Sequence, residues 1–183
     1  MRIITGQSKG RTILVPNIPE IKPAQDIVRQ SVFNIIGHNI EKKTVLDLFA
    51  GSGSFGLESL SRGASWCDFV DIDPRATQTI TKNLETHNFI EKSKVYRMDA
   101  QKFIGETPNT YDYIFLSPYY VEGLVKHILK TLCIVLNPTG VIFYDHFKEI
   151  LVPEVFEGVD GTNLKVVDTR TFGSTAVSIL TKE

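Results

Sequence analysis

The feature that most constrains this chain is an alternation of strand-like and helix-like segments from residue 26 to residue 144. Apolar runs typical of buried strands occupy residues 45–49, 68–72, 94–97, 113–116 and 141–144. Helical spacing of apolar residues occurs at 26–36, after the glycine loop up to Gly63, after Asp73-Pro74, and at 124–132. Strands that alternate with helices predict a parallel sheet covered on both faces.

The C-terminal segment breaks this alternation. Apolar runs at 164–167 and 175–180 are joined by a short link that contains Gly173. Such a pair predicts two antiparallel strands at the sheet edge. We therefore expect an α/β fold with a Rossmann-like, mostly parallel sheet of seven strands and an antiparallel C-terminal pair.

The N-terminal segment differs from the rest in pattern and charge. Residues 1–22 combine glycines and prolines with short apolar runs, which predicts an arm or hairpin, while 23–183 form the main domain. Residues 1–43 carry a net charge of +4 and the remainder −5. A basic arm on an acidic body is typical of a polyanion partner, and a solvated tail is an equal alternative. The basic side chains considered as RNA contacts are Arg2, Lys9, Arg11, Lys22 and Arg29.

A glycine loop follows the first predicted strand. Gly51, Gly53 and Gly56 match G-x-G-x-x-G, in which glycine permits a tight turn close to a ligand. The next helix offers free N–H groups to an anion. Asp71 ends the second predicted strand, where a carboxylate can accept hydrogen bonds from ribose hydroxyls. The loop predicts an adenosine-containing ligand, also contacted by Phe49, Ala50, Ser52 and Ile72.

Two ligands share this loop chemistry. A dinucleotide presents a pyrophosphate, whereas S-adenosylmethionine presents a carboxylate and an ammonium group. Asp47 could pair with that ammonium group, and Asp99-Ala100 follows the third strand, where an acid could hold the adenine amino group. A nicotinamide oxidoreductase would need a catalytic half downstream, for which 183 residues leave no room.

The fourth predicted strand ends in the sequence YDYIFLSPYY. Amino-methyltransferases usually carry [DNS]-P-P-[YFW] here, and Ser117, Pro118 and Tyr120 match three of its four positions. An exocyclic base amine is a poor nucleophile because its lone pair is delocalised. A side-chain oxygen and a proline carbonyl can grip its N–H groups, and an aromatic ring can stack on the base.

Nearly the whole chain resembles the RsmD family of bacterial 16S ribosomal RNA guanine-N2 methyltransferases. The resemblance rests on MRIITGQSKGR, KPAQDIVRQSVFNII, VLDLFAGSGSFGLESLSRGA, FVDIDP and TRTFGSTAVSI. It implies a class I methyltransferase that uses S-adenosylmethionine. It also implies a cytoplasmic monomer that acts on ribosomal RNA or a small-subunit assembly particle.

The chain departs from the family pattern near the expected active site. Lys22 and Ile27 replace arginines, Ser117 replaces aspartate and Tyr119 replaces proline. Two alternatives therefore stay open: a methyltransferase for another RNA or a protein amine, and a relic that binds cofactor and RNA with weakened catalysis. The four histidines and two cysteines lack metal-ligand spacing, so no metal site is expected, and no apolar run approaches a membrane span.

Overall fold

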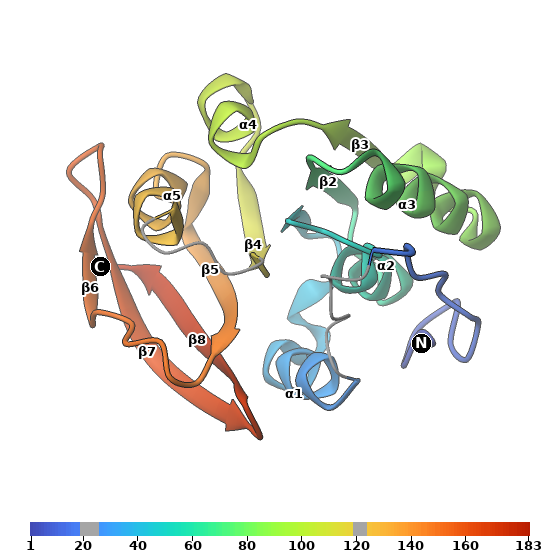
Figure 1. Ribbon diagram of the computed structural model, residues 1–183, viewed down its shortest axis with the longest axis horizontal. Helices are drawn as coiled ribbons and strands as arrows, with labels where there is room; N and C mark the ends of the chain where they lie inside the picture. Colours follow the sequence, from blue (N-terminus) through green and yellow to red (C-terminus); the bar gives the residue numbers. More distant parts are fainter. Residues whose placement is uncertain (19–25, 119–123) are drawn as a thin grey trace.

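The computed structural model describes residues 1–18, 26–118 and 124–183. Within them the chain forms one eight-stranded sheet in the order β3-β2-β1-β4-β5-β8-β7-β6 (Figure 1). Its strands are β1 (Thr44–Leu48), β2 (Trp66–Asp71), β3 (Ser93–Arg97), β4 (Tyr111–Leu116), β5 (Leu136–Phe147), β6 (Val155–Glu157), β7 (Asn163–Phe172) and β8 (Thr175–Lys182).

In the described residues, five α-helices cover the two faces of the sheet. They are α1 (Asp26–Ile36), α2 (Ser54–Ser61), α3 (Pro74–His87), α4 (Ala100–Glu106) and α5 (Leu124–Leu132), with short 3₁₀ turns at Gly37–Ile40 and Ile90–Lys92. Buried residues of α1, α2 and α3 form one apolar cluster with the sheet, and those of α4 and α5 form another. The two helical layers lie on opposite sides of the strands in Figure 1.

The predicted alternation of strands and helices is confirmed. The first five strands are parallel, and β8 pairs antiparallel with both β5 and β7. The predicted helix start at Asp73-Pro74 is also correct, because the Asp73 carboxylate accepts a hydrogen bond from the Arg75 N–H and Pro74 opens α3.

Two details of the expected fold are wrong. The sheet has eight strands in the described residues rather than seven, because the three-residue strand β6 extends it beyond β7. With three residues, β6 is too short to show an alternating pattern. Helix α4 was also not expected, since its seven residues bury only Ala100, Phe103 and Ile104 and include Gly105. None of the described helices is both long and apolar enough to cross a lipid bilayer.

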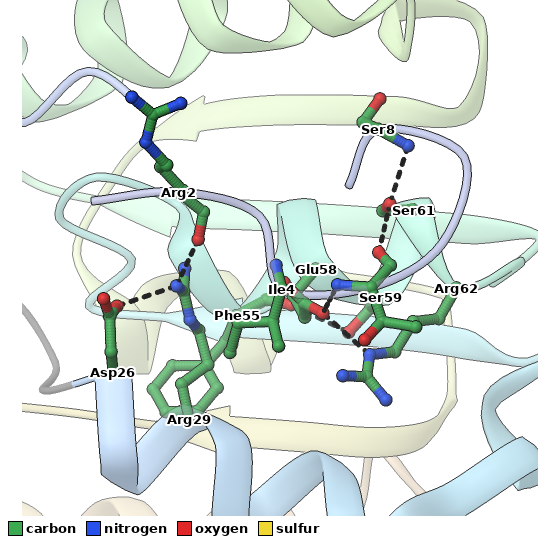
Figure 2. A network of polar contacts seen from close by, with 11 residues as sticks. Arg2, Ile4, Ser8, Asp26, Arg29, Phe55, Glu58, Ser59, Ser61 and Arg62 are labelled. Carbon is green, nitrogen blue, oxygen red and sulfur yellow. Dashed lines mark hydrogen bonds and ion pairs between the residues drawn. The ribbon is translucent and has the colours of Figure 1, made fainter. Parts of the chain in front are cut away.

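Residues 1–18 pack against α2 through a buried carboxylate. Glu58 of α2 is fully buried and accepts hydrogen bonds from the backbone N–H groups of Ile4 (2.7 Å) and Thr5 (2.9 Å). It also accepts a bond from Arg62 at 2.8 Å (Figure 2). Ser61 extends the contact, because its Oγ donates to the Thr5 carbonyl and accepts from the Ser8 N–H.

Close approach of the two backbones requires glycine at position 6. Gly6 has a φ of +89°, and an added Cβ would lie 1.8 Å from the Ser61 carbonyl oxygen. The arm also adds Ile3 and Ile13 to the apolar cluster of α1–α3. It is therefore part of the folded core in addition to being the basic end of the chain.

We predict that Glu58→Gln destabilises the protein, because an amide NH₂ would face backbone donors and the charge opposite Arg62 would be lost. The expected decrease in the free energy of unfolding is about 3 kcal/mol, measured by urea denaturation. Glu85→Gln is the matched control, since Glu85 is exposed on α3. Equal stability of both variants would contradict the assigned role of Glu58.

Candidate functional site

The register of four parallel strands brings the predicted site residues together at their carboxyl ends. Asp47 of β1 pairs with Phe69 of β2 and with Phe115 of β4, which in turn pairs with Phe143 of β5. Phe69, Phe115 and Phe143 all belong to the cluster on the α1–α3 face. Because side chains alternate along a strand, the residues two positions further on face the same side. These residues are Asp71, Ser117 and Asp145.

The glycine loop between β1 and α2 turns through left-handed backbone conformations. Phe49, Gly51 and Gly53 have φ angles of +57°, +56° and +74°. The Gly53 N–H donates to the Ala50 carbonyl at 2.7 Å, which closes the turn. Gly56 allows α2 to approach β2, since an added Cβ would lie 2.2 Å from the Phe69 ring. The predicted tight turn agrees with the structure, whereas the close packing of Gly56 against β2 was not expected.

Asp71 braces this loop from the end of β2. Its two oxygens accept hydrogen bonds from the N–H groups of Gly51 and Asp73, each at 2.9 Å. Burial raises the pKa of the Asp71 carboxyl, and the two N–H donors oppose that shift. Each carboxylate oxygen can accept a second hydrogen bond, so the predicted contact with ribose hydroxyls is compatible with this bracing role.

Asp47 lies beneath the loop and is 1% exposed. One of its oxygens accepts a hydrogen bond from the Gly56 N–H at 2.9 Å. Burial raises its pKa to about 8, the Gly56 bond lowers it, and the nearby Asp71 charge raises it further. No salt bridge joins Asp47 to a cation within the described part of the chain. A ligand ammonium group would supply the missing positive charge, so the donor set fits S-adenosylmethionine.

The other predicted cofactor residues around this loop differ in solvent exposure. Ile72 exposes 66% of its surface next to Asp71, as a hydrophobic platform for a ring would. Ala50, Ser52 and Ala100 are buried, and Phe49 is half-buried. Asp99 caps α4, where its Oδ1 accepts from the Lys102 N–H at 3.0 Å. That capping bond leaves its other oxygen for a ligand.

Ser117 continues the ladder of β4, because its N–H donates to the Leu48 carbonyl at 3.3 Å. Its Oγ is buried and has no hydrogen-bond partner among the described residues. A buried hydroxyl without a partner is costly, so this atom is poised to bond to a ligand. Pro118 is half-buried beside it, and the predicted stacking residue Tyr120 lies outside the described residues.

The predicted RNA contacts divide into two groups. Arg2, Lys9 and Arg11 are exposed on the arm, while Lys22 lies outside the described residues. Arg29 is fully buried in α1, where its guanidinium donates to the Arg2 carbonyl and to Asp26 (Figure 2). The expectation that Arg29 contacts RNA is contradicted by this burial. The burial could have been predicted from the position of Arg29 in the helix, because Arg29, Phe33 and Ile36 lie on one buried face of α1.

Sequence reasoning missed Asn83, which connects the glycine loop to the arm. This fully buried side chain donates to the carbonyls of Ser52 and Leu14 and accepts from the Leu14 N–H. Its burial could have been predicted, because it lies between Ile80 and Leu84 on the buried face of α3. Across the described residues, no group of three or more histidine, cysteine, aspartate or glutamate side chains could hold a metal ion.

We predict that Asp47→Asn stabilises the ligand-free protein at alkaline pH and weakens S-adenosylhomocysteine binding. A carboxyl with a raised folded pKa stabilises fully below its unfolded pKa of 3.8, and this contribution is lost as pH rises through about 8. The advantage of the variant should therefore grow between pH 5 and pH 9, as followed by thermal unfolding. Binding should weaken because the amide cannot pair with the ammonium group, as measured by calorimetry. A pH-independent difference in stability would contradict this assignment.

Comparison with known proteins shows which proteins this chain resembles. Residues 1–181 match the family model described as "Conserved hypothetical protein 95". The chain is 36% identical to "Putative rRNA methyltransferase YlbH" of Bacillus subtilis, across 100% of this chain and 99% of that protein. It is 34% identical to "Ribosomal RNA small subunit methyltransferase D" of Escherichia coli, across 72% of this chain and 66% of that protein.

A solved structure shares the whole architecture. "Putative methyltransferase yhhF from Escherichia coli" superimposes with a TM-score of 0.86 and 28% identity, covering 100% of this chain and 98% of that chain. The sequence resemblance and the predicted class I methyltransferase fold are thus confirmed. The chain belongs to the family described as Conserved hypothetical protein 95, the RsmD-type methyltransferases.

Proposed function

We propose that this chain transfers a methyl group from S-adenosylmethionine to the exocyclic N2 of a guanine in small-subunit ribosomal RNA. Relatives in Escherichia coli and Haemophilus influenzae, 34% and 32% identical, are named ribosomal RNA small subunit methyltransferase D. The observation that carries the proposal is the Oγ of Ser117, which has no partner in the described part of the chain and lies one strand away from Asp47 on the same face of the sheet.

The cofactor would bind along the carboxyl ends of β1, β2 and β3. In this arrangement Asp71 accepts from the ribose hydroxyls, Asp47 pairs with the ammonium group, and the backbone around Gly51 and Gly53 contacts the amino-acid moiety. Ile72 supports the adenine ring, and Asp99 accepts from its amino group. When bound, the cofactor supplies a methyl group activated by a sulfonium, so the protein has mainly to position the acceptor.

The acceptor amine would lie over the end of β4. The Ser117 hydroxyl and the Pro118 carbonyl accept hydrogen bonds from its two N–H groups, which favours a pyramidal nitrogen with an available lone pair. Tyr120 stacks on the base and sets its height. A target base that is stacked in RNA must first be flipped out to reach this position.

The arm would bind the phosphate backbone. Arg2, Lys9 and Arg11 are exposed on it, and Lys22 belongs to the same basic segment. We propose that the protein acts as a cytoplasmic monomer on an assembling small subunit or its RNA.

The test is a methyl-transfer assay with labelled S-adenosylmethionine and small subunits that lack the modification. Label recovered as N2-methylguanosine after nucleoside digestion supports the proposal. Label in another nucleoside or in protein supports a shifted substrate. Background transfer by a protein that still binds S-adenosylhomocysteine supports the relic hypothesis.

We predict that Ser117→Ala lowers turnover by roughly tenfold to a thousandfold, because one of two acceptors for the amine is lost. Affinity for S-adenosylhomocysteine should change little, since the Ser117 Oγ contacts neither Asp47 nor Asp71. Single-turnover kinetics and calorimetry measure the two effects separately. Turnover equal to wild type would remove Ser117 from the active site.

We predict that Lys9→Gln weakens RNA binding and flattens its salt dependence by about 0.7–0.9 in log–log slope, as expected for one lost phosphate contact. Lys165→Gln is the matched control, because Lys165 is half exposed on β7 and pairs with Glu183. Filter binding at several salt concentrations gives both slopes. If Lys9→Gln keeps the wild-type slope, the arm is only structural.

A further inference from the structure

Asp145 lies beside Ser117 at the end of the neighbouring strand. The parallel pair β4·β5 aligns Leu116 with Tyr144, so the next residues on each strand, Ser117 and Asp145, are neighbours about 5 Å apart. Asp145 is opposite Val177 in the antiparallel pair with β8, and Val177 belongs to the apolar cluster on the α1–α3 face. The Asp145 carboxylate therefore faces the same side of the sheet as Asp47 and Ser117.

The surroundings of Asp145 are mainly apolar. Phe143, two residues earlier on the same face, packs on Phe115 with a ring separation of 5.8 Å, and Phe55 stacks on Phe115 at 4.9 Å. The residues that the structure describes give the Asp145 side chain neither a hydrogen bond nor an ion pair, and burial alone raises its pKa to about 6. A half-buried carboxylate without a partner is costly, and such groups occur most often in functional sites.

The next residue, His146, shows what a structural polar side chain looks like on this strand. It faces the other side of the sheet, where one ring nitrogen bonds to Ser178 Oγ at 2.9 Å and the other to the Phe147 carbonyl at 2.8 Å. Both of its polar atoms are thus satisfied within the protein. On the opposite face, Asp145 and the Ser117 Oγ are instead two acceptors on neighbouring strands that lack partners among residues 1–18, 26–118 and 124–183.

We propose that Asp145 recognises the target guanine by accepting a hydrogen bond from its N1–H group, while Ser117 and Pro118 accept from the two N–H groups of N2. The inference rests on the proposed function. Guanine is the RNA base that presents a ring N–H beside an exocyclic amine, so a carboxylate next to the two amine acceptors fits this base. Strand β5 then supplies the negative charge that the motif on β4 lacks at Ser117. Asp145 is in this sense a catalytic residue, because it touches the base whose amine reacts.

Asp145→Asn tests this contact, because it puts an amide donor against a donor of the base at constant size. We expect kcat/KM on the small subunit to fall about a hundredfold with unchanged S-adenosylhomocysteine affinity. Adding Ser117→Asp to Asp145→Asn should restore part of the activity, since a carboxylate returns one strand away. Asp168→Asn is the control, because Asp168 is exposed on β7. Wild-type kcat/KM in Asp145→Asn would overturn the proposal.

A binding experiment separates this inference from the proposed function. With S-adenosylhomocysteine present, wild-type protein should bind inosine monophosphate, which has the N1–H but no 2-amino group, more tightly than adenosine monophosphate, which has neither, and Asp145→Asn should lose this preference. That result supports the assignment even if wild type methylates no small subunit, in which case only the proposed function fails. Equal binding of the two nucleotides by wild type overturns the assignment and leaves the assay of the proposed function to be judged by itself.

Discussion

Two buried carboxylates fix the backbone of the glycine loop, and the rest of the site depends on them. Asp71 holds the Gly51 N–H and Asp47 holds the Gly56 N–H, so both ends of the turn between β1 and α2 are tied to the sheet. An Asp-to-backbone bond of this kind keeps left-handed residues such as Gly51 and Gly53 in one conformation. The cost is the burial of two like charges close together, which a cationic ligand would relieve.

Other buried carboxylates in the fold also accept hydrogen bonds, but they have more partners. The Asp68 carboxylate is fully buried and accepts hydrogen bonds from Tyr111, Trp66 and Asn109, so its role is structural. Glu58 is likewise satisfied by two backbone N–H groups and Arg62. Compared with these, Asp47 has a single partner and Asp145 has none among the described residues. The number of hydrogen-bond partners thus separates Asp68 and Glu58, which are satisfied within the protein, from Asp47 and Asp145, to which we assign ligand contacts.

Much of the fold could be predicted because parallel strands and their helices have strong apolar patterns. The glycine loop and Asp71 were also predictable, since their chemistry depends on local sequence. The placement of Ser117 and Asp145 on neighbouring strands was not, because it depends on the register of β4 and β5, which are separated by α5. The arm was predicted only as a basic extension: nothing local in Ile4 or Thr5 indicates that their N–H groups reach Glu58. Arg29 was wrongly predicted to contact RNA, because its charge was given more weight than its position on the buried face of α1.

The docking of the arm also has a consequence for the order of events during synthesis. The arm leaves the ribosome well before its partners: Glu58 is 54 residues after Ile4, Asn83 is 69 after Leu14, and Thr86 is 75 after Arg11. The bond to Glu58 cannot form until α2 has emerged, and the bonds to Asn83 and Thr86 cannot form until α3 has emerged. This basic segment of the nascent chain therefore remains incompletely docked, next to the RNA of the translating ribosome, until α3 has been made.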